Sequence, residues 1–448
     1  MFQGKKIFIL GMARSGYEAA KLLINRNNEI IINDNNQNQD KRKCAELKKL
    51  GVKVILGEHP LELFDQSFDY LIKNPGIKND HIYVKKALSY NIPVLNEVEM
   101  AFHLFPKDVD IIGITGTNGK TTTTTIIYLI LKKAFKRVHL LGNIGIPVSS
   151  FVKRLKPKDI IVMEVSIQQL CNFQNFKTTM SIFTNLFPAH LDFVDNYENY
   201  QQIKKRIFNH HTNKNLAILN YDNNDLLKLT NDIPSSKKYF SSKKENVKGC
   251  YLKEEAIYYN EEKIISLKEI KLKGVHNYEN IMAAIIVAKE YDVSNEIIKS
   301  VLKEFKGVEH RIEFVRKLKG VEFYNDSKST NIKATQIALS SFNKPIILLL
   351  GGLDRGHSFL ELNKYLKNVK LIISFGETKE RIKEWAHKLN KDCLVLDNLK
   401  GVIEEVEKNM VNGDLVLLSP ACASWDQYAD FEERGREFKE LVNKLKGD

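Results

Sequence analysis

A buried strand that runs directly into a glycine-rich turn and then a helix constrains this chain most. Residues 109–114 form an apolar, β-branched run. From Gly113 within this run, glycines recur at every third position, at Gly116 and Gly119. Glycines let the backbone turn tightly and direct N–H groups at phosphate oxygens, and the Lys120-Thr121 pair can offset phosphate charge and bind Mg²⁺. A plain strand-to-helix turn would not need that pair, so the pattern predicts a phosphate loop, although Ile114 stands where the strict GxxxxGK[ST] motif has glycine.

Two more α/β segments flank this one. Residues 6–10 and 29–33 are strand-like runs separated by a helical pattern, and a third series of strand-like runs starts at residue 345. At about 150 residues per domain, 448 residues correspond to roughly three domains. We therefore predict an α/β protein with mostly parallel sheets and three domains. Their boundaries are predicted at residues 1–98, 99–307 and 308–448.

Composition indicates an ordinary folded chain without a membrane segment. Hydrophobic residues make up 43% and charged residues 27%, and no apolar run approaches the roughly 18 residues of a membrane span. Five dispersed cysteines without a CxxC pair indicate reduced thiols, so we expect a cytoplasmic protein. The net charge of +13 could attract nucleic acid or equally small polyanions such as ATP and a sugar nucleotide. The basic residues are spread along the chain in patterns typical of solvated helix faces, so nucleic-acid binding is not expected.

A second glycine pattern follows the first strand. Gly11 and Gly16 flank a turn that half matches a dinucleotide fingerprint, with Ala13 in place of the middle glycine. Asp34 ends the next strand, where a nucleotide-binding βαβ unit places an acid. Either the turn binds a nucleotide-linked substrate, or its glycines serve only tight packing of helix on sheet.

Further polar groups follow predicted strands. Glu164 ends one such run, and His190 with Asp192 lies in a loop beyond the next, a set that suits a hard cation near phosphates. In the last third, polar clusters at residues 325–331, 351–355 and 419–426 stand at the carboxyl ends of strands, where open α/β sheets bind ligands. Turn chemistry explains one such cluster, but three together favour a binding site.

These motifs together resemble the Mur ligase family over essentially the whole chain. The loop at residues 113–121 is similar to the ATP loop of all Mur ligases and of the folylpolyglutamate synthetases. The segments at 325–331 and 418–427, with Phe431, resemble the members that add D-glutamate. The resemblance implies a UDP-substrate-binding Rossmann-like domain, a central ATP-binding P-loop domain and a C-terminal amino-acid-binding Rossmann-like domain.

The resemblance also implies roles for individual residues. Lys120, His190 and Lys204 are the expected catalytic residues, and two Mg²⁺ ions are expected, held by Thr121, Glu164, His190 and a carbamylated Lys204. The expected ATP contacts are Gly116, Thr117, Asn118, Gly119, Lys120, Thr121, Thr122, Asn277, Asn280, Arg311 and Asp326. The expected contacts of the UDP-linked substrate are Ser15, Gly16, Asp34, Asn35, Asn36, Asn74, Gly76, Asn143, Ser166 and His190. The expected D-glutamate contacts are Lys328, Thr330, Arg355, Ser424 and Phe431.

The implied activity is ATP-dependent addition of D-glutamate to UDP-N-acetylmuramoyl-L-alanine through an acyl phosphate, in peptidoglycan precursor synthesis. A monomer without nucleic acid or membrane partners is expected. The alternative is another Mur-type or folylpolyglutamate-type amide ligase, against which the 325–331 and 418–427 segments argue. A nucleotide-binding regulatory module would not need Glu164, His190 and an acidic-substrate pocket together, and a basic nucleic-acid-binding protein would bind duplexes in a strongly salt-dependent way.

Overall fold

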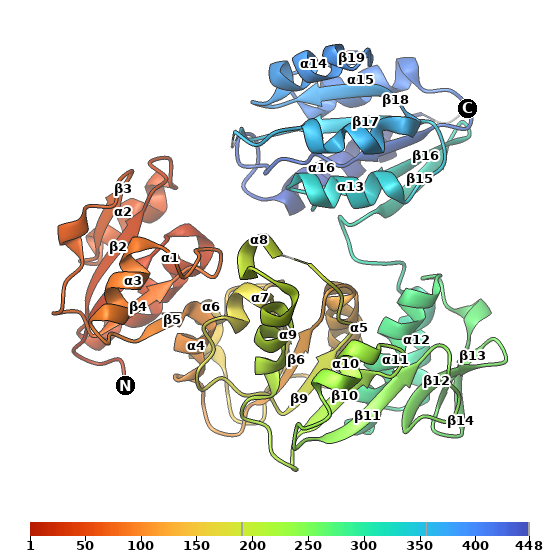
Figure 1. The fold of residues 1–448 in the computed structure, drawn as a ribbon. Coiled ribbons are helices and arrows are strands. Elements are labelled where there is room, and N and C mark those ends of the chain that lie inside the picture. Colours follow the sequence, from red (N-terminus) through yellow and green to blue (C-terminus); the bar gives the residue numbers. More distant parts are fainter. Residues whose placement is uncertain (190, 355, 447–448) are drawn as a thin grey trace. The chain divides into compact units, whose positions relative to one another are not determined.

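The computed structural model describes residues 1–189, 191–354 and 356–446. The chain divides into two compact units, Met1–Phe305 and Lys306–Asp448. Within the described residues, the first unit contains two β-sheets and the second unit contains one (Figure 1). The prediction of an α/β fold with mostly parallel sheets is confirmed. The further division of the first unit at residue 98 stays a prediction.

The N-terminal sheet is wholly parallel, in the order β3-β2-β1-β4-β5. Its strands are β1 (Lys6–Leu10), β2 (Glu29–Asp34), β3 (Lys53–Leu56), β4 (Tyr70–Lys73) and β5 (Val94–Asn96), and its helices are α1 (Ala13–Leu23), α2 (Lys41–Lys49), α3 (Ile82–Ser89) and α4 (Glu97–Phe102). Alternate side chains of β1 point to opposite faces, so Ile7 and Ile9 pack with α1 and α2 while Phe8 packs with α3.

The central sheet has the order β14-β13-β12-β11-β10-β9-β6-β8-β7 and is parallel from β7 to β12. Its strands are β6 (Asp110–Thr115), β7 (Val138–Gly142), β8 (Ile160–Glu164), β9 (Met180–Phe183), β10 (Leu216–Asn220), β11 (Ser236–Ser241), β12 (Gly249–Lys253), β13 (Ala256–Tyr259) and β14 (Glu262–Ser266). Its helices are α5 (Lys120–Ala134), α6 (Val148–Phe151), α7 (Ile167–Leu170), α8 (Leu191–Val194), α9 (Tyr197–Lys205), α10 (Asn224–Leu229), α11 (Val275–Glu290) and α12 (Asn295–Glu304).

Helix α4 joins these two sheets into one body. The Asn96 side chain donates to the Gln169 carbonyl at 2.6 Å, and the buried Glu99 carboxylate accepts from the Asn175 amide at 2.7 Å. One hydrophobic cluster runs from Ile9 of β1 to Met163 of β8. The N-terminal and central sheets therefore share a continuous core.

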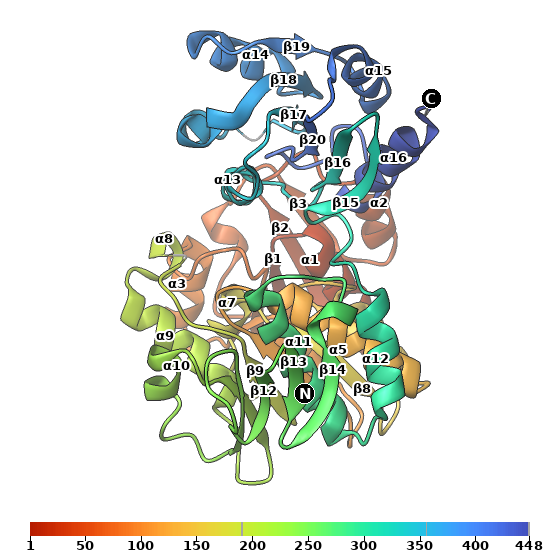
Figure 2. The same cartoon turned by 90° about the vertical axis from the view of Figure 1, so that its right-hand side faces the viewer.

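The second unit is a six-stranded sheet in the order β15-β16-β20-β17-β18-β19, antiparallel only between β15 and β16. Its strands are β15 (Glu313–Leu318), β16 (Val321–Asn325), β17 (Ile346–Gly351), β18 (Val369–Phe375), β19 (Cys393–Val395) and β20 (Leu415–Leu418), and its helices are α13 (Ile332–Ser340), α14 (Lys379–Lys388), α15 (Leu399–Asn409) and α16 (Phe431–Lys444). Helices α13 and α14 cover one face of this sheet and α15 and α16 the other; Figure 2 shows α13 and α16 on opposite sides of β16 and β20.

Among the described residues, no helix combines the length and the apolar character that a membrane crossing requires.

Candidate active site

The glycine-rich loop joins β6 to α5, and two of its glycines occupy positions that no side chain could share. Gly116 has φ +145°, and a Cβ there would lie 1.9 Å from Thr184 Oγ1. Gly119 has φ +80°, and its Cβ would lie 2.2 Å from Asn280 Oδ1. Both residues need left-handed backbone as well as space, which only glycine combines at low cost. The loop backbone is thus brought against β9 and α11.

Contacts from distant segments hold the loop in shape. The Thr117 amide donates to the Asn185 carbonyl at 2.9 Å, and the Asn118 amide donates to Asn185 Oδ1 at 2.8 Å. Thr117 Oγ1 lies 3.0 Å from the Tyr200 hydroxyl. Gly119, the N-cap residue of α5, has no side chain with which to cap the helix. A helix N-terminus that follows a fixed loop is a favourable place for an anion, because its N–H groups and dipole attract negative charge.

Two lysines converge on this loop from different helices. Lys120 Nζ donates to the carbonyls of Gly116 and Thr117, both at 3.0 Å. Lys204 of α9, which is only 1% exposed, donates to the Gly116 carbonyl at 2.7 Å and to Thr115 Oγ1 at 3.1 Å. Burial, with a smaller effect from the Lys120 charge, holds the pKa of Lys204 well below its usual range.

Glu164 supplies a buried carboxylate beside the loop. It ends β8, pairs with Ile114 of β6, and is 2% exposed. Asn143 Nδ2 donates to Glu164 Oε1 at 2.6 Å, whereas Oε2 has no hydrogen-bond partner among the described residues. A buried carboxylate oxygen without a donor suits a cation ligand, because the oxygen otherwise bears an uncompensated desolvation cost.

The remaining predicted ATP contacts in the first unit lie on α5 and α11. Thr121 is buried and Thr122 is half-buried. Asn280 is buried behind the loop, where its Oδ1 accepts from Thr123 Oγ1 at 3.1 Å. Asn277 is half-buried, and its Nδ2 donates to the Lys273 carbonyl at 2.8 Å. Asn280 therefore packs directly against the loop, and Asn277 lies about one turn earlier on α11.

Residues predicted for the UDP-linked substrate gather at the carboxyl edge of the N-terminal sheet. Asn74 Nδ2 donates to Ser15 Oγ at 3.1 Å, and the Gly76 amide donates to Asn74 Oδ1 at 3.0 Å. Asp34 accepts from the Asn36 amide at 2.8 Å, and Asn35 beside it is exposed. These loops thus form one polar rim over β1, β2 and β4.

The first glycine turn also serves tight packing. A Cβ at Gly16 would lie 2.0 Å from the Gly11 carbonyl oxygen. The Met12 amide donates to Asp34 Oδ2 at 2.7 Å, so part of that carboxylate is committed to the turn itself. Elsewhere, Ser166 caps α7 in a reciprocal capping box with Gln169.

In the second unit, Asp326 follows β16 and is almost fully buried. Its amide donates to the Leu418 carbonyl at 2.8 Å, and its carboxylate accepts from the Ile312 amide at 3.2 Å and from Ser419 Oγ at 2.7 Å. Burial raises the pKa of Asp326 to about 6, against the opposing effect of these donors.

The residues predicted for D-glutamate lie at the same edge of this sheet. Lys328 Nζ stands over the Phe431 ring, 5.7 Å from its centroid. Thr330 is half-buried on the same loop. Ser424 is 1% exposed, and its Oγ has no hydrogen-bond partner among the described residues. His190 and Arg355, which the sequence also predicted as site residues, lie outside the described residues.

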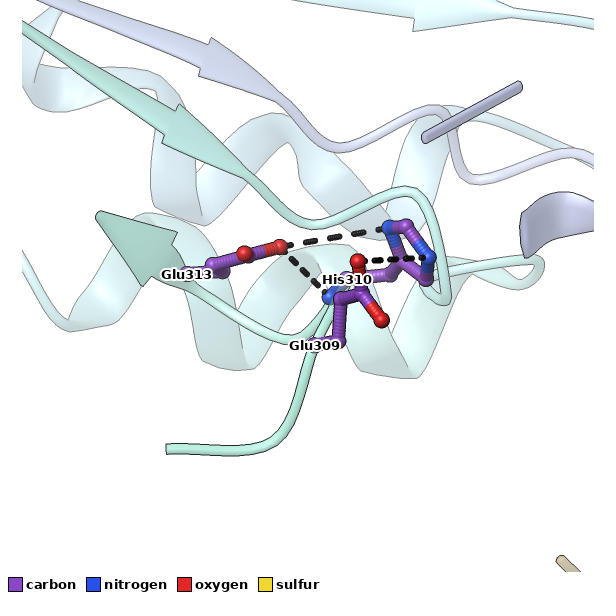
Figure 3. Close-up of side chains that lie close together, drawn as sticks. All are labelled: Glu309, His310 and Glu313. Carbon is purple, nitrogen blue, oxygen red and sulfur yellow. Dashed lines mark hydrogen bonds and ion pairs between the residues drawn. The ribbon is translucent and has the colours of Figure 1, made fainter. Parts of the chain in front are cut away.

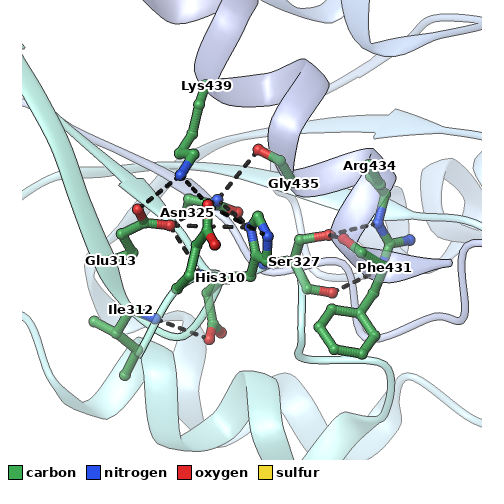
Figure 4. A network of polar contacts seen from close by, with 11 residues as sticks. His310, Ile312, Glu313, Asn325, Ser327, Phe431, Arg434, Gly435 and Lys439 are labelled. Atoms are coloured by element: carbon green, nitrogen blue, oxygen red, sulfur yellow. Dashed lines mark hydrogen bonds and ion pairs between the residues drawn. The ribbon is translucent and has the colours of Figure 1, made fainter. Parts of the chain in front are cut away.

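Arg434 joins the segments 325–331 and 418–427 of the second unit, and no sequence pattern singles it out. It is fully buried in α16; Nε donates to Ser327 Oγ at 3.0 Å and Nη2 donates to the Ser327 and Cys422 carbonyls at 2.9 and 3.1 Å. Ser327 Oγ in turn donates to the Phe431 carbonyl at 2.8 Å (Figure 4). Asn185 and Tyr200 were missed likewise, although Asn185 stands at the carboxyl end of a predicted strand.

Comparisons with known proteins agree with this arrangement. The Mur ligase middle domain matches residues 114–288, and the Mur ligase, glutamate ligase domain matches residues 310–422. A UDP-N-acetylmuramoylalanine--D-glutamate ligase of Geobacillus sp. (strain WCH70) is 43% identical over 447 residues, covering 99% of each chain. The protein of that name from Bacillus subtilis (strain 168) is 42% identical over 446 residues, covering 99% of this chain and 98% of its own.

Solved structures share the fold at lower identity. The UDP-N-acetylmuramate-alanine ligase MurC of Thermotoga maritima superposes with a TM-score of 0.60 at 19% identity, covering 99% of this chain and 100% of its own. The MurF ligase of Thermotoga maritima, solved in complex with ADP, gives 0.52 at 19% identity, covering 93% and 95%. With both domain matches and full-length relatives above 40% identity, this chain belongs to the Mur ligase family.

Proposed function

We propose that the chain is an ATP-dependent ligase that adds D-glutamate to UDP-N-acetylmuramoyl-L-alanine in peptidoglycan precursor synthesis. The observation that carries this proposal is the similarity over the full length to ligases named for that reaction. The alanyl carboxylate attacks the γ-phosphorus of ATP and ADP leaves, giving an acyl phosphate. The D-glutamate amine then attacks the acyl carbon, loses a proton and expels phosphate, which leaves an amide.

The phosphate loop supplies positioning and charge in the first step. Both reactants are anions, so their approach requires cationic groups and N–H donors at the transferring phosphoryl group. Lys120 already lies over the loop, with Nζ 3.0 Å from the Gly116 carbonyl. This ammonium group would provide that charge by moving onto the γ-phosphate. The N-terminal amides of α5 would then surround the β-phosphate.

Mg²⁺ is the metal that this chemistry implies. When bound, it neutralises charge on the β- and γ-phosphates and fixes their geometry. The residues present fit the ion, because Glu164 Oε2 is a buried carboxylate oxygen without a donor among the described residues. Thr121 follows Lys120 at the start of α5, where its hydroxyl can contribute a second oxygen. A second Mg²⁺ would be held by His190 and a modified Lys204.

Lys204 is suited to carbamylation. Its burial favours the neutral amine, the form that attacks CO2 and, after losing a proton, becomes a carbamate anion. That anion supports a metal ion that the ammonium would repel. We expect activity to fall in CO2-depleted buffer and to recover with bicarbonate, and a ¹³C-carbamate resonance to appear with ¹³CO2 in the wild type and not in Lys204→Gln. A fully active protein without that resonance would exclude the carbamate.

The other two substrates are assigned to the polar loops at the carboxyl edges of the N-terminal sheet and of the sheet in the second unit. The rim around Ser15, Asp34 and Asn74 would bind the uridine diphosphate of the first substrate. Lys328, with Arg355, supplies the positive charge that a dicarboxylate requires, and Ser424 Oγ offers an uncommitted hydroxyl. We assign these functions to three domains, at residues 1–98, 99–307 and 308–448, in a monomer that acts in the cytoplasm.

Phosphate release from ATP tests the whole proposal. It would be measured with UDP-N-acetylmuramoyl-L-alanine and a panel of amino acids of both hands, each with and without Mg²⁺. We expect release to depend on D-glutamate and on Mg²⁺. Release that depends instead on L-alanine, a diamino acid or a dipeptide would favour another Mur-type ligase, and release with folate and L-glutamate would favour a folylpolyglutamate-type ligase.

A further inference from the structure

A buried histidine in the second unit lies between the end of β16, the start of β15 and the middle of α16. His310 is 3% exposed and has φ +62°, a conformation that residues other than glycine seldom adopt. Its Nδ1 lies 2.9 Å from the Asn325 side-chain nitrogen, deep in the network of Figure 4. A histidine in this position needs an explanation, because burial of an imidazole at positive φ costs stability.

The hydrogen bonds assign the ring tautomer. Asn325 Oδ1 accepts from the Ser327 amide at 3.2 Å, which fixes the orientation of the Asn325 amide and makes Nδ2 the donor toward His310. Nδ2 also lies 3.1 Å from Glu313 Oε2 and 3.2 Å from the Gly435 carbonyl oxygen, so its two N–H groups are shared among three acceptors. His310 Nδ1 is therefore an acceptor, and the ring proton sits on Nε2, 3.8 Å from Glu309 Oε1.

Helix α16 leaves a space for this ring. A Cβ at Gly435 would lie 2.2 Å from His310 Nδ1, so even alanine would displace the imidazole. Glycine inside a helix is less stable than alanine, and the close approach of the His310 ring gives a reason for glycine at this position. Gly401 in α15 provides the contrast, since a Cβ there meets nothing closer than 3.4 Å.

The cluster is not a vacant metal site. One ligand atom each of Glu309, His310 and Glu313 lies within 4.8 Å of the others (Figure 3). However, Lys439 Nζ already contacts the Glu309 and Glu313 carboxylates, at 2.5 and 3.0 Å, and His310 Nδ1 faces an amide donor. The Lys439 ammonium group thus already supplies the positive charge in this cluster, so Glu309, His310, Glu313 and Lys439 form a structural hub.

This hub connects directly to groups assigned above to the nucleotide and to D-glutamate. The His310 carbonyl accepts from the Lys328 amide at 3.0 Å, and the Ile312 amide donates to Asp326 Oδ1 at 3.2 Å. Residues 310–312 therefore lie beside residues 326–328, with Arg311 between the two contacts. A displacement of the ring would move Arg311, Asp326 and Lys328 together.

We propose that His310 is a positioning residue for the ligation reaction, and that Gly435 in α16 provides the space for its ring. Asn325, donating to Nδ1, locks the ring against the helix and thereby sets the two loops that bear Arg311, Asp326 and Lys328. The proposal rests on the proposed function for the identity of the ligands, but the lock itself is a property of the second unit alone.

Steady-state kinetics of the full chain test the lock. His310→Ala removes the acceptor, whereas His310→Asn retains a short acceptor and tolerates positive φ. We expect His310→Ala to raise KM for ATP and for D-glutamate by about 10-fold, the effect of about 1.4 kcal/mol, and His310→Asn to recover most of it. The Kd for UDP-N-acetylmuramoyl-L-alanine, which would bind the first unit, should stay unchanged.

Gly435→Ala should reproduce the His310→Ala defect, whereas the matched helix variant Gly401→Ala should not. Because the clash requires the ring, Gly435→Ala should add little in a His310→Ala background; independent effects would multiply. Equal defects in His310→Ala and His310→Asn, a normal Gly435→Ala protein, or multiplicative effects in the double variant would each overturn the proposal.

A spectroscopic measurement separates this inference from the proposed function. Long-range ¹H–¹⁵N spectra should assign His310 to the Nε2–H tautomer in the wild type, and Gly435→Ala should change that signature even where no ligation is detected. An Nδ1–H tautomer would overturn the lock. A wild type with the expected tautomer but no D-glutamate-dependent phosphate release would refute the proposed function only. The spectra also decide the matter if His310→Ala fails to fold.

Discussion

Two lysines share one carbonyl at the centre of the phosphate loop. Lys120 and Lys204 both donate to the Gly116 oxygen, at 3.0 and 2.7 Å. Burial, with a smaller effect from the like charge of Lys120, lowers the pKa of Lys204 and favours its neutral form. In the proposed mechanism, Lys120 is therefore the group that carries positive charge to a phosphate, and Lys204 is the group that is carbamylated.

Lys120→Ala should reduce ligation by about 10³-fold, because a charge that stabilises a transferring phosphoryl group contributes about 4 kcal/mol. Initial rates of phosphate release would measure the loss, with circular dichroism to confirm the fold. Lys133→Ala, an exposed change in the last turn of the same helix, is the matched control and should remain active. Near-normal turnover of a folded Lys120→Ala protein would refute the assigned role.

His211 should make the first unit sensitive to acid. It is buried among the hydroxyls of Thr178, Ser181 and Ser235, and burial lowers its pKa to about 4. The unfolded chain takes up a proton near pH 6.5 and the folded chain does not. The contribution of His211 to the free energy of unfolding is therefore fully present above pH 6.5 and is lost as the pH falls toward 4.

The expected loss over this window is about 3 kcal/mol. Urea unfolding at pH 7.5 and pH 4.5 would measure it, and His211→Gln should lose less stability between these two pH values than the wild type does. Parallel pH dependence in both proteins would show that His211 remains protonated in the fold or contributes nothing.

At the scale of elements, each predicted ligand site lies where a strand ends and a loop leads toward the next helix. β6 leads through Gly116 into α5, β1 leads into α1, and β16 leads into the loop that bears Asp326. Parallel strands bring these carboxyl ends to one side of their sheet, so polar loops far apart in sequence meet there. The loop between β6 and α5 is the most tightly determined, because Thr184 and Asn280 occupy the space around its glycines.

Gly116→Ala should distort that loop, because its Cβ would lie 1.9 Å from Thr184 Oγ1. We expect ATP affinity, measured by calorimetric titration with a non-hydrolysable analogue, to fall at least about 10-fold while the affinity for UDP-N-acetylmuramoyl-L-alanine is retained. Gly51→Ala is the matched control, since Gly51 also has positive φ but open space around it. Equal effects of the two variants would attribute the loss to backbone strain alone.

At the scale of the molecule, the two units have separate cores. One cluster extends from the N-terminal sheet into the central sheet, whereas the third sheet has its own clusters on its two faces. Hydrophobic stabilisation is therefore supplied independently to Met1–Phe305 and Lys306–Asp448. Such chains depart from two-state unfolding.

Calorimetry should resolve two transitions, and Leu348→Ala should lower only one. Leu348 is fully buried in β17, and removal of a buried leucine side chain costs about 2–5 kcal/mol, or several degrees in Tm. Val411→Ala, at an exposed position of the same unit, should shift neither transition. A single transition that moves as a whole would show that the units unfold cooperatively.

Local signals were enough to predict much of this protein. Apolar runs that end in glycine or polar residues predicted the strands β1, β2, β6 and β17, because a strand buried on both faces requires a continuous apolar run. The Lys120-Thr121 pair and the motif resemblance predicted the family, which the comparisons confirm. The roles assigned to individual site residues stay predictions.

Only the tertiary structure revealed the groups that hold the loops in place. Asn185 reaches Asn118 across 67 positions, Arg434 reaches Ser327 across 107, and His310 reaches Gly435 from another element. Such contacts leave no periodicity in the chain, since a buried polar side chain is selected by the partner that satisfies it and not by its neighbours in sequence. The sequence by itself therefore determined which elements form and predicted where ligands bind, and packing decided which distant residues hold the loops at those predicted sites.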